Sequence, residues 1–156
     1  MKFSTREDIE APLEYVFSQV SDFAGLERSA LRRGADVQRV DQLSVPGPGM
    51  IWDTAFDLRG KRRNARLELI QYDPPNGMRF SSGSAAMNGD LVLELVALSR
   101  GRTRLSLEAE LLPQNLSARL LVQSLKLAKS NLTKRYEMRI ATYARDLEDR
   151  YRRRSA

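Results

Sequence analysis

The sequence of 156 residues contains no histidine and no cysteine. The lack of histidine excludes a Ser-His-Asp triad, a histidine-ligated zinc site and a histidine general base. The lack of cysteine excludes disulfides and thiol catalysis. Acid–base chemistry would fall to carboxylates, lysine or tyrosine. We therefore predict no metal and no cofactor, assign no catalytic residue, and favour a binding protein over an enzyme.

Long apolar runs are also missing, and no stretch approaches the ~20 apolar residues of a transmembrane helix. The first residues, Met1–Asp8, have no apolar region of the kind that secretory signals carry. We therefore expect a cytoplasmic protein. The length fits one domain over residues 1–156. We expect its arginine-rich end, from about residue 150, to be frayed.

Glycine and proline are absent from Gln114 onward. An apolar stripe at steps of three, four or seven residues runs through this segment, and that spacing indicates one face of a helix. Its members are Leu121, Leu125, Leu132, Tyr136, Ile140, Tyr143, Leu147 and Tyr151. A straight helix over residues 115–150 would be about 54 Å long, whereas a chain of this size is roughly 40 Å across. We therefore predict an overhang, or a bend or break at Ser117 or Ser130-Asn131.

The first 113 residues alternate between short strands and turns. A strand over Phe3–Ile9 is followed by a helix that begins at Pro12, where the missing N–H costs nothing. Ser21 or Asp22 can cap a second short helix that runs to about Arg33. Six further strands are predicted, within residues 37–43, 50–58, 65–69, 78–82, 91–95 and 103–111. The small, polar segment Ser81–Asp90 between two of them is predicted to be a loop or a weakly held edge.

Alternation assigns the faces of the hairpins. A two-residue loop at Gly60-Lys61 would pair Phe56 with Ala65, Thr54 with Leu67 and Trp52 with Leu69, with all of these on one face. A three-residue loop at Arg100-Gly101-Arg102 would pair Leu95 with Leu107 and Leu93 with Ala109. Asp53 and Asp57 then lie on the outer face, with Arg66 between them on the paired strand. We interpret these three as surface cross-strand pairs rather than as acid–base machinery.

Four segments resemble, in this order, those of the superfamily of START lipid-transfer domains, birch-pollen-allergen-like proteins and bacterial polyketide cyclase/dehydrase proteins. They are Ile9–Phe17, Val20–Phe23, Pro48–Trp52 and Asp73–Phe80. The resemblance covers nearly the whole chain. It implies an α+β helix-grip fold, in which a seven-stranded antiparallel sheet wraps a long C-terminal helix and two short helices follow the first strand. It also implies a hydrophobic cavity between sheet and helix that takes a lipid, quinone or polyketide-like ligand.

We therefore predict a ligand cavity lined by inward-facing residues, which are Trp52, Thr54, Phe56, Leu67, Leu69, Met78, Phe80, Leu93, Leu95, Leu105 and Leu107. The helix would add Ser124, Leu125, Asn131, Leu132, Arg135, Tyr136 and Ile140. The alternative is that these side chains only fill a core. The loop Pro46–Gly49 lacks a phosphate-binding pattern, and we interpret it as a turn or as a gate at the cavity mouth.

Two other functions stay open at this point. One is an enzyme of the cyclase/dehydrase type, which would need a carboxylate, tyrosine or lysine with a perturbed pKa inside the cavity. The other is a basic adaptor for the ribosome or an anionic membrane, since the net charge is +6. No specific nucleic-acid motif accompanies the basic clusters, and the oligomeric state is not predicted. The clusters are Arg28/Arg32/Arg33, Lys61–Arg63, Arg100/Arg102/Arg104 and Lys126/Lys129/Lys134/Arg139.

Overall fold

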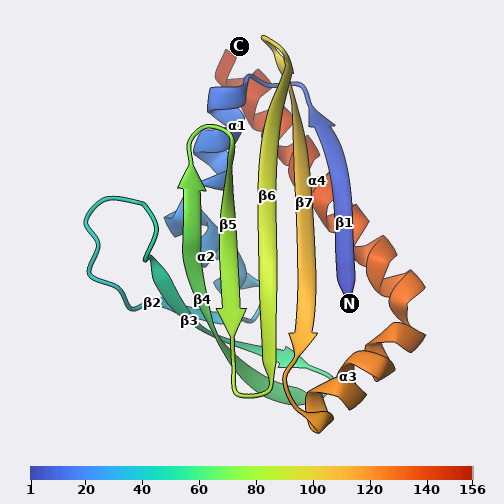
Figure 1. The fold of residues 1–156 in the computed structure, drawn as a ribbon. Coiled ribbons are helices and arrows are strands. Elements are labelled where there is room, and N and C mark those ends of the chain that lie inside the picture. The colour runs from blue at the N-terminus through green and yellow to red at the C-terminus, as the bar shows by residue number, and fades with distance from the viewer. Residues whose placement is uncertain (156) are drawn as a thin grey trace.

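A seven-stranded antiparallel sheet forms one layer of the molecule, and the helices lie on one of its faces (Figure 1). This computed structural model describes residues 1–155. The strand order is β1-β7-β6-β5-β4-β3-β2. The strands are β1 (Lys2–Ile9), β2 (Asp36–Arg39), β3 (Ile51–Leu58), β4 (Lys61–Asp73), β5 (Gly77–Gly83), β6 (Met87–Ser99) and β7 (Arg102–Pro113). The helices are α1 (Leu13–Val20), α2 (Phe23–Arg32), α3 (Leu116–Leu127) and α4 (Lys129–Ser155). The predicted order of elements and the α+β class are confirmed.

The two short helices begin where the sequence predicts. Pro12 occupies the N-cap of α1, and the Asp22 carboxylate caps α2 by accepting a hydrogen bond from the Gly25 N–H (3.2 Å). The chain leaves α2 through Gly34, whose φ of +90° is a conformation that glycine adopts without a steric penalty. α1 buries Val16, Phe17 and Val20, which pack into the main core.

Both predicted hairpin registers are wrong by two residues. In the structure Thr54 pairs with Ala65 and Trp52 with Leu67, because the two-residue turn is Arg59-Gly60 rather than Gly60-Lys61. Both turn residues have positive φ, 52° and 75°, which is the geometry of a tight hairpin turn. A shift of two residues keeps every side chain on its predicted face. The faces were therefore predicted correctly and the partners were not.

The β6–β7 hairpin shows the same kind of difference. Leu95 pairs with Leu105 and Leu93 with Leu107, and the register shifts between Ala97 and Ser99. The irregularity adds a residue to β6 just before the turn, a device that the apolar alternation does not reveal. β2 is also shorter than predicted and ends at Arg39.

The long C-terminal helix breaks at Ala128, two residues before the predicted Ser130-Asn131. Ala128 leaves the helical conformation (φ −106°, ψ 16°) and separates α3 from α4, and Figure 1 shows the change of direction at this point. α4 continues through Ser155, and fraying of the end from about residue 150 stays a prediction. Tyr151 packs on Tyr15, with ring centroids 4.9 Å apart. Ala156 lies outside the described residues.

The main core lies where α1 and α4 meet the sheet. Leu147 of α4, Ile9 of β1 and Leu69 of β4 are fully buried in it. Phe23 of α2 and Phe80 of β5 both pack against Trp52 with tilted rings, whose centroids lie 5.5 and 6.1 Å from that of Trp52. Much of the predicted apolar set therefore fills a core in this half of the molecule.

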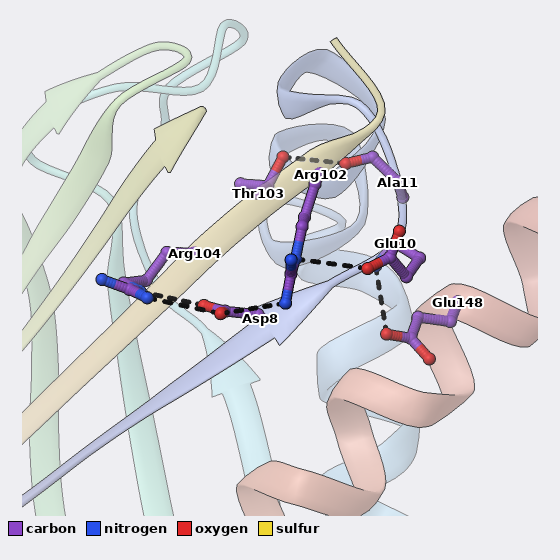
Figure 2. Close-up of polar contacts among 7 residues, drawn as sticks. All are labelled: Asp8, Glu10, Ala11, Arg102, Thr103, Arg104 and Glu148. Carbon is purple, nitrogen blue, oxygen red and sulfur yellow. Dashed lines mark hydrogen bonds and ion pairs between the residues drawn. The ribbon is translucent and has the colours of Figure 1, made fainter. Parts of the chain in front are cut away.

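A polar network ties the first strand to β7 and α4 (Figure 2). Asp8 pairs with Arg104 (2.9 Å) and Arg102 (3.4 Å), and the Arg104 guanidinium holds the pKa of the Asp8 carboxyl below its usual range. The Glu10 N–H donates to Glu148 of α4 at 3.0 Å. Beside these contacts, the buried Thr103 hydroxyl donates to the Ala11 carbonyl oxygen at 2.8 Å. This end of the sheet is fixed by directed contacts as well as by apolar packing.

The loop between β2 and β3 is organised by Asp41, whose side chain is 5% exposed. Its carboxylate accepts hydrogen bonds from Arg39 Nε (2.8 Å) and from the backbone N–H groups of Leu43 and Ile51 (both 2.9 Å). These contacts, the Arg39 guanidinium first, lower the pKa of Asp41. The segment Pro46–Gly49 lies within this loop as a series of bends and turns.

We predict that Thr103→Val destabilises the fold by about 1–3 kcal/mol, because the shape is kept while a buried acceptor loses its donor. Urea unfolding would show a lower midpoint with an unchanged slope. Thr142→Val, an exposed threonine of α4, should leave the midpoint nearly unchanged. An unchanged midpoint for Thr103→Val would mean that the hydrogen bond contributes nothing.

We predict that Asp41 makes folding stability depend on acid pH. Its folded-state pKa is lowered, so its contribution is present above the unfolded value of about 3.9 and is lost as the pH falls through the folded pKa. Asp41→Asn should be less stable at pH 7 and should lose less stability than the wild type between pH 5 and pH 2. Parallel pH profiles for the two proteins would contradict this. Asp73→Asn, at an exposed position, serves as the control.

Candidate ligand cleft

A cleft of about 980 Å³ lies between α3 and the end of the sheet farthest from the Thr103 network. α3 forms one wall with Ala118, Leu121 and Leu125, of which Ala118 and Leu125 are buried. The helix is positioned by Asn115, whose side-chain oxygen accepts the Ala118 N–H at 2.8 Å. The floor comes from strands β3 to β7. This is the half of the molecule that α4 leaves uncovered once the helix has broken at Ala128.

The floor is mainly apolar because alternate residues of each strand face it. Thr54 and Ala65 are a cross-strand pair, as are Leu67 and Ser82, and all four line the cleft. Further floor and edge residues include Phe56, Leu58, Phe80, Leu91, Ala109 and Leu111. The corrected register therefore sets which of the predicted residues become neighbours here.

The segment Ser81–Asp90 was predicted as a loop or a weak edge, and this prediction is wrong. Ser81 to Gly83 belong to β5 and Met87 to Asp90 to β6, in the middle of the sheet, with only three residues between the strands. Strand pairing requires backbone groups rather than large side chains, so small residues can sit at the centre of a sheet. Their small side chains leave the volume of the cleft unfilled. At Gly89 even a Cβ atom would lie 3.2 Å from the Glu110 carbonyl oxygen.

Most polar strand residues at the cleft occupy outward-facing positions, whereas Thr54 and Arg63 lie on the inward face. The Thr54 hydroxyl donates to the Ala65 carbonyl oxygen at 2.8 Å. Arg63 is half-buried on the inward face, and its Nε donates to the Leu58 carbonyl oxygen at 3.1 Å. Its two terminal nitrogens have no partner within residues 1–155. Sequence reasoning placed Arg63 only in a basic cluster. The signal that could have found it is its alternation with Ala65 and Leu67.

The predicted cavity residues divide into four groups. Thr54, Phe56, Leu67, Phe80 and Leu125 line the cleft. Trp52, Leu69, Met78, Leu95 and Leu105 are buried in the core, and Leu93, Leu107, Leu132, Tyr136 and Ile140 are half-buried. Ser124, Asn131 and Arg135 are exposed and lie outside the cleft wall.

The Tyr136 hydroxyl donates to the Leu107 carbonyl oxygen (2.7 Å), and burial raises its pKa to about 12. None of residues 40–50 lines the cleft, so the loop Pro46–Gly49 is not a gate to it.

The carboxylates at the cleft belong to outward-facing strand positions. Asp53 pairs with Arg66 at 2.8 Å, which lowers the pKa of Asp53, and Asp90 pairs with Arg79 at 3.5 Å. Glu110 lies opposite Lys2 in the β1–β7 register. Asp57 pairs with Arg62 at 3.3 Å. Asp53 and Asp57 thus form surface cross-strand pairs as predicted, but Arg66 lies opposite Asp53 rather than between the two aspartates.

The four basic clusters do not converge on one face. In the third cluster, Arg102 and Arg104 pair with Asp8 at the end of the sheet opposite the cleft. In the second, Arg62 pairs with Asp36 (2.6 Å) while Arg63 turns into the cleft. The first cluster and Arg139 of the fourth do meet, on the outer side of α4.

Comparison with known proteins was made for sequence and for structure. No protein-family model and no curated protein matches the sequence. TTHA0849 from Thermus thermophilus superposes with a TM-score of 0.69 at 17% identity, and both chains are covered completely. The Zhui aromatase/cyclase from Streptomyces sp. R1128 gives 0.67 at 11% identity, over all of this chain and 96% of that one. Ara h 8.0201 gives 0.57 at 14% identity, over 94% and 98%.

The chain has the helix-grip fold. The architecture agrees with the one that the sequence resemblance implied: a seven-stranded sheet, two short helices after the first strand and a C-terminal helix. Identities of 11–17% show the fold alone. Within residues 1–155, no helix combines the length and the apolar character needed to span a bilayer.

Proposed function

We propose that this protein binds a small hydrophobic molecule in the cleft between α3 and the sheet. The observation that carries the proposal is an apolar floor of inward-facing strand residues that remains open beside α3, with a volume of about 980 Å³. Ligand sites are typically concave, mostly apolar and 300–1,000 Å³ in size. An aromatase/cyclase is among the proteins that share the fold, which supports a small organic molecule as the occupant.

Arg63 suggests that the preferred ligand carries an anionic group. Its terminal N–H groups are free to form a charge-assisted, two-pronged contact with a carboxylate. The carboxylates at the cleft lie on outward-facing positions, so they leave Arg63 as the charge that the interior presents. The cleft therefore suits an amphipathic molecule whose apolar part lies on the floor and whose acid group contacts Arg63.

Binding and carrying is favoured over catalysis. Among the described residues that line the cleft there is no tyrosine, and Lys61 is exposed at its rim. The two tyrosines whose pKa burial raises, Tyr136 and Tyr143, lie elsewhere. The lining thus offers no enclosed acid or base for a cyclase/dehydrase reaction.

A substitution that fills the cleft tests the proposal. The neutral fluorescent probe N-phenyl-1-naphthylamine should bind the wild type with increased emission, and Ser82→Trp should weaken its binding by at least about tenfold because indole occupies the floor. Ser81→Trp is the matched control, since Ser81 is the neighbour on the opposite face of β5 and does not line the cleft. It should change the affinity less than twofold. Absence of probe binding to the wild type, or equal loss in both variants, would overturn the assignment of the cleft.

A second experiment tests the role of Arg63. Dodecanoate and dodecan-1-ol would compete with the same probe, and the wild type should prefer the acid. Arg63→Met should reduce that preference by about tenfold, because a charge-assisted hydrogen bond is worth roughly 1.5–3 kcal/mol. Arg119→Met, on the exposed side of α3, should preserve it. An unchanged preference for the acid in Arg63→Met would show that Arg63 does not recognise the ligand. It would not contradict the assignment of the apolar cleft as the binding site.

A further inference from the structure

A second cleft, of about 770 Å³, lies between α2 and α4 and is lined by arginines from both helices. We define the arginine cleft by these six side chains, which are Arg28, Arg32, Arg33, Arg135, Arg139 and Arg150. Two aspartates, Asp22 and Asp146, also line it, so it carries an excess of four positive charges. One of the aspartates, Asp22, is already engaged as the N-cap of α2.

The arginines of this cleft differ from most arginines of the sheet in having no acidic partner. On the sheet Arg62, Arg66 and Arg104 each form an ion pair at 3.3 Å or less. Within residues 1–155, none of the six cleft arginines forms one. Among the described residues, Arg150 is the one cleft arginine whose side chain forms a hydrogen bond, donating to the Gln19 side-chain oxygen at 3.1 Å. The cationic groups of the cleft are thus available to an external anion.

The spacing concentrates this charge. Arg28 and Arg32 are four residues apart on α2, and Arg135 and Arg139 are four apart on α4, so each pair shares one helix face. Like charges at this spacing disfavour a helix. Arg32 and Arg33 also stabilise the C-terminal end of the α2 dipole, but this does not account for Arg28 or for the α4 pair. A bound anion would relieve the repulsion on both walls.

The residue type and the shape of the cleft indicate a compact phosphate-bearing ligand. The cations lining the cleft are all arginines, whose planar guanidinium contacts two oxygens of one phosphate. Ser29 and Thr142 add hydroxyl donors, and burial raises the pKa of Tyr143 to about 12, which keeps its hydroxyl protonated. A flat bilayer cannot contact both walls of a concave site. A nucleic-acid groove would offer stacking aromatics, whereas Tyr143 is the one aromatic residue of the lining.

We propose that the arginine cleft binds a small polyanion that carries two or more phosphate groups. This site lies on the outer side of α4 and is distinct from the apolar cleft beside α3, and the two lining sets share no residue. The proposal does not depend on the function of the apolar cleft.

Calorimetric titration with sodium tripolyphosphate at 50 and 200 mM NaCl tests this proposal. The wild type should bind tripolyphosphate, and orthophosphate at least about tenfold more weakly because it meets fewer guanidinium groups. Arg32→Gln/Arg139→Gln, which removes one cation from each wall, should weaken tripolyphosphate binding by at least about tenfold. The matched control, Arg119→Gln/Arg145→Gln, removes the same net charge from exposed positions outside the cleft and should change the affinity less than threefold.

Two checks make the result decisive. The unfolding midpoint of Arg32→Gln/Arg139→Gln should stay close to that of the wild type, because the loss of like-charge repulsion offsets the loss of Arg32 at the C-terminal end of the α2 dipole. N-phenyl-1-naphthylamine should bind the variant unchanged. An equal loss of tripolyphosphate affinity in both double variants would show that the anion is attracted by net charge alone, and it would contradict a specific site in the arginine cleft. So would absence of tripolyphosphate binding at 1 mM, including the case in which single-stranded RNA or phosphatidylglycerol vesicles bind through the same arginines.

Discussion

The break at Ala128 is the constraint on which the apolar cleft depends. A segment of more than forty residues without glycine or proline favours continuous helix, yet it is longer than the sheet that it covers. α3 buries Ala118, Val122 and Leu125, while α4 buries Ala144 and Leu147. Ile140 follows Leu125 by fifteen positions, which rotates a straight helix about 60° past a whole number of turns. One straight helix would therefore point only part of this apolar surface at the sheet, and the change of direction lets both segments pack. The gap that results beside α3 is the apolar cleft.

The sequence predicted faces well and neighbours poorly, for a physical reason. Side-chain alternation in a strand depends only on local geometry, so Trp52, Thr54 and Phe56 could be assigned to one face without knowing their partners. Register depends on the turn. Arg59 adopts a positive φ of 52° beside Gly60. Residues other than glycine rarely adopt a positive φ, so the residue type does not predict this turn. The helix break is similar, because alanine is the strongest helix former and only tertiary packing explains why the chain bends there.

The apolar cleft was the least predictable part of the molecule because it arises from small side chains rather than from large ones. The prediction selected big apolar residues, and many of these, such as Leu69 and Leu105, are fully buried and fill the core. The space lies instead over Ser82, Ala65 and Gly89. Ranking residues by hydrophobicity identifies those that fill the core. A cavity also requires small side chains at positions where the strand backbone is still hydrogen-bonded to its neighbours.

The arginines of this basic chain fall into two groups: those that form ion pairs within the fold and those that have no acidic partner and can bind an external anion. Along the sheet, acidic residues pair with most of the arginines, as in the Arg66–Asp53 pair at 2.8 Å, and such exposed pairs are worth little. Between α2 and α4 acidic residues are sparse, and arginines gather from segments more than a hundred positions apart in the sequence. Composition alone reports both populations as one net charge of +6. Only the fold shows that Arg28 and Arg139 face the same space, so a uniform basic surface is the wrong description. Six of the arginines without an acidic partner are gathered in this one concave site, which favours a compact anion over an extended one.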